Sequence, residues 1–569
     1  MGWLGLLAVV WLWLAPPAAA EPAAPATGSE ASASSAAGLG RLWETLGDRP
    51  DPSGEIAGMQ LRRNLVNVTK LCLAALGAGL LSWGIWLRRR GRPEAHRIGR
   101  DALLVALGVA GFWGWWNFLY LHYPGAVHTN NVYVYYVGAK YFPELRYDGL
   151  YECTAVADFR SGLRERVRQR QITNLQSYAL EGTAEIVAHP ERCTGRFTPQ
   201  RWAAFEDDVA WFRGRIPAGD WEEIQRDHGY NPPPSWGLLG TLLAGRGPID
   251  TTRLALLVLL DPLLDLAMWA CVWWAFGWRA LCVALLYWGT NHTAEFAWTG
   301  GSFLRDDWLA ATLVGICLLR RGWPFAAGCL LGYGALLRIF PGLALAGIAA
   351  AAGLDMLRQR RFEIRPAHAR IALGAALAVA LVVPASALVA GGMESWTDFA
   401  RNTQLHLGTP ESNHVGLRTL LSYDPEGRLS QLLGVAEDPS AAWKQARIRA
   451  FEGRRWIYVL GVVAYLLLLG RALLRQEDWV AAILGLGALL VVVEPTCYYT
   501  SILLAFGLLW TRWEVIGAAL LLLSVAQWAA AAAFLPWGEL FSAQSVALVA
   551  FVAFATATAR TPRSAAAPL

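Results

Sequence analysis

The chain has 569 residues, of which 55% are hydrophobic and 29 are tryptophan, and it carries a net charge of +5. This composition excludes an ordinary soluble enzyme, because apolar stretches of roughly 12 to 24 residues recur and the longer ones are typical of transmembrane helices. The basic residues are almost all arginine and lie between apolar runs, so we expect no nucleic-acid partner.

The N-terminal residues 1–20 form an apolar run that is too short to span a bilayer and ends in small residues, which is typical of a secretory signal peptide. The positive charge that usually opens such a signal is missing, so an uncleaved N-terminal anchor is the alternative. Residues 21–65 begin with an Ala-, Pro- and Ser-rich stretch, which predicts a disordered external linker.

The remaining apolar runs predict an all-α fold, a polytopic transmembrane helical bundle of about 11 to 13 spans. Several runs are short for a bilayer of roughly 30 Å, so broken or tilted helices are expected among them. Two first spans (66–121) precede a core (253–392) with a break near 338–341, and C-terminal spans (456–559) precede a tail (560–569). The runs are 66–87, 101–121, 253–276, 279–291, 303–319, 323–337, 341–356, 369–392, 456–474, 479–493, 500–511, 514–535 and 543–559.

The orientation follows from arginine clusters that all fall on one side if every run crosses, and the positive-inside rule makes that side cytoplasmic. These clusters are Arg88, Arg89, Arg90, Arg92, Arg97 and Arg100, then Arg320 and Arg321, residues 358–370, and Arg471 and Arg475. The long segments 122–252 and 393–455 then face outward, with helices expected in these external loops, and the tail lies inside. One basic cluster around Arg447 and Arg454 breaks the rule, so we expect an amphipathic helix on the outer surface there.

Cys153 and Cys193 are the two cysteines in the long external segment 122–252. An oxidising exterior favours a disulfide between them, and two free thiols are the alternative. The chain has no Cys-x-x-Cys or His-Glu-x-x-His spacing and no phosphate-binding glycine loop. We therefore predict no metal ligands and no ATP-driven work.

Polar and aromatic side chains gather where external segments meet helices, and residues 128–151 are the richest of these segments. They contain His128, Asp148 and six tyrosines, so the segment offers a candidate general base and aromatic rings for a site at the membrane surface. Similar segments are 227–234, 300–307, 401–418 and 494–499, with Arg338 at the break before Pro341. Arginines at several such positions favour a phosphate ligand, because guanidinium binds phosphate oxygens in pairs.

Each of these residues also has a structural interpretation. Tyrosine at a membrane edge is usually an anchor, and Asp306 and Asp307 beside Arg305 are typical of a helix start. The functional interpretation rests on the segments falling together on one side of the membrane, under an orientation assigned from arginines alone.

In order along the chain, these motifs resemble the GT-C glycosyltransferases, membrane enzymes that use polyprenyl-phosphate sugars, and within them an uncharacterised bacterial mannosyltransferase-like branch. The resemblance covers roughly residues 100 to 510. The motifs that carry it are Tyr135-Tyr136-x-x-Ala139, Asp148-Gly149-Leu150-Tyr151, Tyr230 to Pro234, Gly300-Gly301 to Asp307, Arg338-x-x-Pro341 and Asn413-His414-x-Gly416-Leu417.

One departure concerns the base. The family usually has an acidic residue shortly before the tyrosine pair, whereas this chain has His128-Thr129-Asn130-Asn131, and asparagine cannot act as a base. We therefore assign the catalytic role to Asp148 or His128. The resemblance allows a divalent metal, but the missing acid argues against one, so no cofactor is predicted.

The resemblance implies transfer of a sugar, a hexose, from a polyprenyl-phosphate donor to a glycan or lipid acceptor at the outer face of a bacterial inner membrane, among membrane lipids. Arg338 would bind the donor phosphate with help from Arg418 or Arg401, and the other expected substrate-binding residues are Tyr135, Tyr136, Tyr151, Asn413 and His414. A transporter or flippase of a lipid-linked or anionic substrate is the alternative. Its best support is Asp261 and Asp265, which share one face of an apolar helix. A catalytically inactive partner protein is the third hypothesis.

Overall fold

The computed structural model describes residues 54–122, 126–245, 247–361, 363–436, 438–533 and 537–559. The expected signal or anchor, most of the linker and the tail 560–569 lie outside these residues. These described residues are 75% helical, with almost no strands among them. A short antiparallel pair, β1 (Gln171–Thr173) with β2 (Leu180–Gly182), is the β-structure of the described part.

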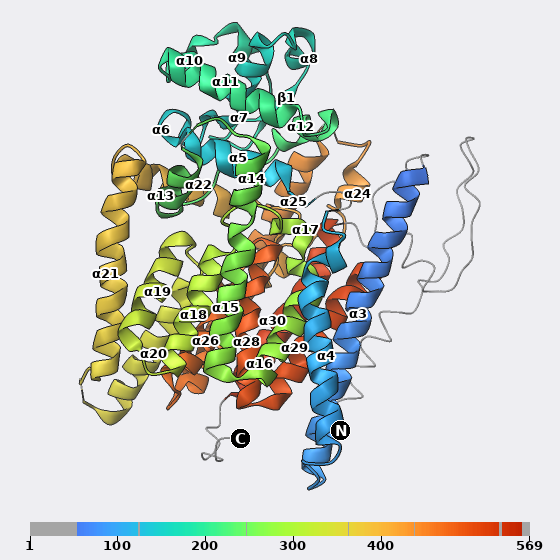
Figure 1. Cartoon of the computed structure of the whole chain (residues 1–569), viewed down its shortest axis with the longest axis vertical. Coiled ribbons are helices and arrows are strands. Elements are labelled where there is room, and N and C mark those ends of the chain that lie inside the picture. Colours follow the sequence, from blue (N-terminus) through green and yellow to red (C-terminus); the bar gives the residue numbers. More distant parts are fainter. Residues whose placement is uncertain are drawn as a thin grey trace.

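A long helical bundle forms one layer of the molecule, and a smaller helical domain sits on one end of it (Figure 1). The bundle contains α3 (Gly54–Arg89), α4 (Arg97–Trp115), α14 (Thr251–Val258), α15 (Leu260–Phe276), α16 (Trp278–Thr290), α18 (Asp307–Arg320), α19 (Pro324–Leu337), α20 (Gly342–Gln359), α21 (Pro366–Val389), α25 (Pro439–Leu473), α26 (Asp478–Leu486), α28 (Leu504–Leu508), α29 (Glu514–Ala532) and α30 (Trp537–Thr558).

The smaller domain, which we call the cap, comprises residues 129–226. Its helices are α5 (Thr129–Lys140), α6 (Phe142–Leu145), α7 (Gly149–Arg160), α8 (Arg164–Arg168), α9 (Ala184–Ala188), α10 (Glu191–Thr194), α11 (Pro199–Arg213) and α12 (Ala218–Ile224). Shorter elements join it to the bundle or lie at the same end. They are η1 (Asn117–Leu119), α13 (Pro234–Ala244), η2 (His292–Ala294), α17 (Phe296–Thr299), α22 (Glu394–Gly408), α23 (Leu417–Leu421), α24 (Leu429–Leu432), α27 (Leu489–Val492), η3 (Cys497–Leu503) and η4 (Leu509–Thr511).

Six helical stretches of the described chain are long and apolar enough to cross a membrane, which indicates a membrane-embedded protein. They are Leu61–Arg89, Thr251–Phe276, Pro366–Val389, Pro439–Leu473, Glu514–Ala532 and Gly538–Thr558. The other predicted runs also lie on helices, among them the shorter apolar stretches Pro324–Leu337, Asp478–Val492 and Cys497–Thr511. The helix α3 begins at Gly54, inside the segment that we expected to be a linker.

Small residues let the bundle helices approach closely. At the crossing of α4 and α16, a Cβ atom on Gly289 would lie 1.8 Å from the carbonyl oxygen of Gly111, so no larger residue fits there. Such contacts are typical of helices that pack without a hydrophobic driving force between them.

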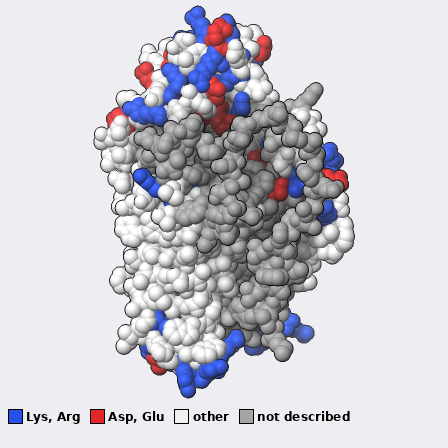
Figure 2. All heavy atoms as spheres, turned by 90° about the vertical axis from the view of Figure 1, so that its right-hand side faces the viewer, with Lys and Arg blue, Asp and Glu red and all other residues white. Residues whose placement is uncertain are grey.

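The arginine-rich loops lie together at the end of the bundle away from the cap. Ion pairs join them across different helices: Arg88 with Glu514 at 2.6 Å, and Arg279 with Asp101 at 2.7 Å. Figure 2 shows basic residues at this lower end and charged residues of both signs on the cap. The arginines therefore mark one end of the bundle, as the sequence predicted.

The basic cluster that broke the charge rule belongs to α25, which runs without interruption from Pro439 to Leu473. The prediction of a separate amphipathic surface helix is therefore wrong. Arg447 is buried and donates to the Thr419 carbonyl at 2.9 Å, and Arg454 donates to the carbonyls of Leu421 and Tyr423. These arginines satisfy free carbonyls at the end of α23, which explains their position on this side.

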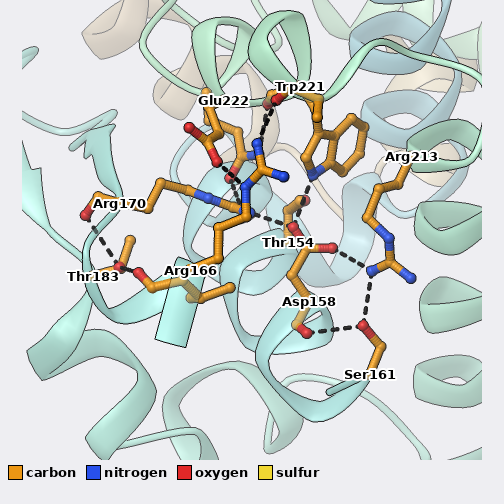
Figure 3. Close-up of polar contacts among 12 residues, drawn as sticks. Thr154, Asp158, Ser161, Arg166, Arg170, Thr183, Arg213, Trp221 and Glu222 are labelled. Carbon is orange, nitrogen blue, oxygen red and sulfur yellow. Dashed lines mark hydrogen bonds and ion pairs between the residues drawn. The ribbon is translucent and has the colours of Figure 1, made fainter. Parts of the chain in front are cut away.

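The cap has its own crosslink and a buried ionic core. A disulfide joins Cys153 on α7 to Cys193 on α10. The fully buried Asp158 accepts hydrogen bonds from Arg170 Nη1 at 2.7 Å, Arg213 Nη1 at 2.6 Å and Trp221 Nε1 at 2.8 Å (Figure 3). Two guanidinium groups and an indole thus converge on one carboxylate and hold four separate segments together.

Candidate functional site

A small cavity of about 10 Å³ lies near the cap end of the bundle. Its charged and hydroxyl-bearing lining residues come from three separate loops, and its apolar wall is formed largely by tryptophan. The polar lining is Thr299, Arg305, Asp306, Arg338, Tyr498, Tyr499 and Ser501, and the wall includes Trp115, Trp288 and Trp308. Aromatic walls with a few convergent polar groups are typical of small-molecule sites.

Arg338 reaches this cavity because α19 is short. The helix has 14 residues, which rise about 21 Å, less than the roughly 30 Å of a bilayer core. Arg338 follows it in an extended conformation, with φ −148° and ψ 141°, and Pro341 opens the next helix. Only 7% of Arg338 is exposed, and its Nη1 donates to the Leu337 carbonyl at 2.7 Å.

Arg305 is placed by a loop whose backbone is fixed from two sides. Gly301 has φ +66°, and a Cβ atom there would lie 2.2 Å from the Ala126 carbonyl oxygen, so the loop needs glycine at this point. The carboxylate of Asp261, on α15, accepts hydrogen bonds from the backbone amides of Arg305 at 2.9 Å and Asp306 at 3.2 Å. This contact gives Asp261 a structural role.

The Arg305 guanidinium lies between two tyrosine rings, with its Cζ 4.2 Å from the centre of Tyr135 and 5.4 Å from the centre of Tyr498. Among the described residues, its Nε and Nη1 atoms are buried without a hydrogen-bond partner. Neither Arg305 nor Arg338 has a carboxylate of the described chain within ion-pair distance. Asp306 and Asp307 attract the two guanidinium groups only from beyond ion-pair distance, so the unpaired nitrogen atoms of Arg305 remain suited to an anion.

Asp306 lines the same cavity and is the carboxylate closest in sequence to Arg305. Its neighbour Asp307 is the first residue of α18, and one of its oxygens accepts the Trp308 amide at 2.7 Å while the other is buried without a partner in the described chain. Asp306 is therefore the carboxylate in position to take a proton from a molecule in the cavity.

Tyr498 and Tyr499 are held by a strand-like contact with the late external loop. The backbone of His414 forms a β-bridge with Thr496, and the Cys497 amide donates to the Asn413 carbonyl at 2.8 Å. Asn413 and His414, which we predicted to bind substrate, therefore support the cavity through their backbone. A 3₁₀ helix, η3, follows directly and is long for its type.

Three predicted site residues lie in the cap. Asp148 pairs with Arg196 at 3.0 Å and accepts from Gln176 Nε2 at 2.9 Å. Tyr136 packs on Phe212 in the cap core, and the fully buried Tyr151 accepts the Gly229 amide at 3.1 Å through its hydroxyl oxygen. None of the three lines the cavity.

The predicted arginines of the second external segment also have other partners. Arg418 pairs with Glu494 at 3.3 Å, and Arg401 is 75% exposed and pairs with Asp398 at 3.2 Å. The structure brings Arg305 to Arg338 instead. We had placed Arg305 in the polar segment 300–307 but gave it no binding role, because Asp306 and Asp307 beside it are typical of a helix start.

His128 lies beside the Arg305 loop, and its backbone amide donates to the Gly301 carbonyl at 2.8 Å. Burial, helped by the nearby His122 and Arg305, lowers the pKa of His128 to about 3. A histidine with this pKa is neutral at pH 7 and accepts a proton poorly, so His128 is better suited to positioning the loop than to acting as the base.

His, Cys, Asp and Glu side chains of the described residues form no group of three or more that could hold a metal ion. No family model matches the chain, and neither does any curated protein or solved structure.

Proposed function

We propose that the protein is a membrane glycosyltransferase that transfers a hexose from a polyprenyl-phosphate donor to a glycan or lipid acceptor. The proposed place of the reaction is the outer face of a bacterial inner membrane, with the arginine-rich end of the bundle in the cytoplasm. The observation that carries the proposal is the pair of buried arginines, Arg305 and Arg338, which line one cavity with no carboxylate of the described chain within ion-pair distance. The resemblance of the motifs to GT-C enzymes supports it.

In this proposal the two guanidinium groups bind the donor phosphate. The acceptor hydroxyl oxygen attacks the anomeric carbon, and the bond from that carbon to the phosphate oxygen breaks. The phosphate leaves with the bonding electrons as polyprenyl phosphate, and arginine stabilises its charge. The acceptor proton passes to the carboxylate of Asp306, which replaces Asp148 and His128 in this role. The configuration of the sugar is inverted, because one displacement occurs.

Aromatic side chains supply the rest of the site. Trp115 and Trp288 stack at 4.5 Å between ring centres, and Trp308 contacts Tyr499 edge to face at 5.5 Å. Such faces suit the apolar side of a sugar ring and the first isoprene units of the donor.

The experiment is release of polyprenyl phosphate from a radiolabelled polyprenyl-phosphate hexose by the purified protein in vesicles, with a mixture of lipid and glycan acceptors. Release that depends on acceptor supports the proposal. Donor binding without release of polyprenyl phosphate, with every acceptor, would favour the hypothesis of a catalytically inactive partner protein. In that case Asn131 has a structural role, since its side-chain oxygen accepts a hydrogen bond from the Ser302 hydroxyl at 2.7 Å.

A transporter is the second candidate because of Asp265. This α15 carboxylate is 1% exposed, and both of its oxygens lack a hydrogen-bond partner among the described residues. Ionisable groups in this position often mark a substrate or proton path. Movement of the labelled donor across sealed vesicles, lost in Asp265→Asn and without cleavage of the donor, would favour the transporter.

A further inference from the structure

A second cavity lies at the arginine-rich end of the bundle, away from the candidate active site. Its volume is about 390 Å³, and it is formed by the end of α20, by Arg365 at the end of the connection to α21 and by the turn after α25. The lining residues are Asp355, Arg358, Gln359, Arg365, Arg475 and Gln476.

The charge of this cavity is not balanced. Its one carboxylate, Asp355, pairs with Arg365 at 3.2 Å. Arg358 and Arg475 are exposed and have no ion pair or hydrogen-bond partner for their side chains in the described chain. Some other arginines at the same end are neutralised, as Arg320 and Arg512 are by Glu477 at 3.4 and 2.9 Å. The cavity therefore keeps two uncompensated positive charges.

The surroundings of the cavity are apolar and face outward. Leu357, in the same turn as Arg358, is 66% exposed, and Ile364, next to Arg365, is 64% exposed. The adjoining helices α21 and α25 are candidate membrane spans with exposed apolar faces, which include Leu373 at 62% and Leu467 at 71%. A ligand here would meet cationic groups at the helix ends and hydrocarbon-facing surface beside them.

We propose that this cavity binds the phosphate headgroup of an anionic phospholipid, with Arg358 and Arg475 as the phosphate ligands and the acyl chains along the outward faces of the adjoining helices. Guanidinium suits phosphate oxygens, and basic cavities between spans at helix ends are suited to anionic headgroups. A free phosphate ion carries the same kind of charge as the headgroup, but it makes no contact with the apolar surface beside the cavity. The proposal is independent of the glycosyltransferase function.

The test is native mass spectrometry of the full chain in detergent, titrated with phosphatidylglycerol or with phosphatidylcholine. We expect Arg358→Gln/Arg475→Gln to bind phosphatidylglycerol at least about tenfold more weakly than wild type, because each basic residue near an anionic lipid contributes roughly 1 kcal/mol. The matched control is Arg89→Gln/Arg92→Gln, which removes two exposed arginines at the same end but outside the cavity and should bind as wild type does.

A third variant and a competition measurement test the proposal further. Asp355→Asn removes the carboxylate that repels phosphate, so it should strengthen phosphatidylglycerol binding, a gain that misfolding cannot imitate. Inorganic phosphate should not displace the lipid. Equal binding by the Arg358/Arg475 variant, equal loss in the control, or no gain in Asp355→Asn would overturn the proposal. Competitive displacement by inorganic phosphate would assign the cavity to a free anion instead and overturn the lipid assignment.

Discussion

Arg305 and Arg338 line one cavity from two separate loops, one before α18 and one after α19, and these two helices pack against each other. Each guanidinium is at least nine-tenths buried, and the exposed fractions are 4% and 7%. The two like charges repel each other, and Asp306 and Asp307 offset this repulsion only from beyond ion-pair distance, so an anion bound between the guanidinium groups would be stabilised. The pair is therefore the part of the structure that most directly indicates a ligand.

Loss of either arginine should weaken donor binding. We expect Arg305→Gln and Arg338→Gln to raise the donor Kd by about 10- to 100-fold, since a hydrogen bond to a charged group contributes about 1.5 to 3 kcal/mol. Arg338→Lys should restore part of the affinity, because lysine keeps the charge without the bidentate fork. Donor binding is measured by scintillation proximity with the labelled donor. Arg160→Gln, which opens an exposed pair with Glu206 in the cap, is the control and should bind as wild type.

The two candidate bases make opposite predictions. Asp306→Asn should lower kcat by about 100-fold or more with little change in donor Kd, because a base acts in the chemical step. Asp148→Asn should leave kcat within a few-fold of wild type, since Asp148 is paired with Arg196 in the cap. The measurement is single-turnover release of polyprenyl phosphate. The reverse ranking of the two variants would return the base to Asp148.

The helices of the bundle could largely be predicted from the sequence, because an apolar run or an arginine cluster depends only on residues that are neighbours in the chain. The helix α25 shows the limit of this approach. The C-terminal part of α25 was predicted correctly, because it contains the apolar run 456–474. The role of Arg447 could not be predicted, because it depends on the Thr419 carbonyl in another helix, which no local pattern reveals.

The site was predicted only in outline for the same reason. Tyr135 and Tyr136 are adjacent in sequence but point about 100° apart on α5, so one lies against Arg305 and the other in the cap core. Asp148 looked available for catalysis because its partner Arg196 follows 48 positions later. The position of Arg305 depends on Asp261, which holds its backbone, and on Tyr498, which packs on its guanidinium. Both are distant in sequence, so no local pattern predicts this position.

The buried carboxylate of Asp158 should contribute more to the free energy of unfolding of the cap than its exposed ion pairs do. Asp158→Ala leaves Arg170 and Arg213 without their shared partner and should lower the free energy of unfolding of the cap by about 3 to 5 kcal/mol. Glu206→Ala, which breaks the exposed pair with Arg160, should cost about 0 to 1 kcal/mol. Hydrogen exchange of cap amides measures both. Similar protection in the two variants would contradict a central role for Asp158.

The disulfide should stabilise the cap independently of that network. Replacing Cys153 and Cys193 with serine should lower the free energy of unfolding by about 2 to 5 kcal/mol, because the bond closes a long loop in the unfolded chain. The expected readout is a lower melting temperature of the double variant, with reducing agent lowering wild type to the same value. Cys72→Ser, at an exposed free thiol, is the control. A double variant that melts with wild type would mean that the bond does not form.

The junction between the cap and the second external segment should depend on pH through His228. Its Nε2 lies 2.9 Å from Glu411 and its Nδ1 lies 3.3 Å from Asp227. Burial alone would lower the pKa of His228, but these two carboxylates raise it to about 9. The facing groups are Tyr178, His406 and, through Glu411, Lys444.

A histidine whose pKa is higher in the folded state than in the unfolded state stabilises the fold when it is protonated. This stabilisation is complete below the pKa of the unfolded state, about 6.5, and is lost as the pH rises through the folded-state pKa of about 9. Burial lowers the pKa of His406 to about 4, so its effect falls at acid pH, outside this window. We expect His228→Asn to be less stable than wild type at pH 6.5, by at most roughly 3 kcal/mol, and to approach it by pH 10. Thermal melting across this range measures the difference. His189→Asn, at an exposed site in the cap, should run parallel to wild type throughout. Parallel curves for His228→Asn as well would show that its charge does not hold the junction.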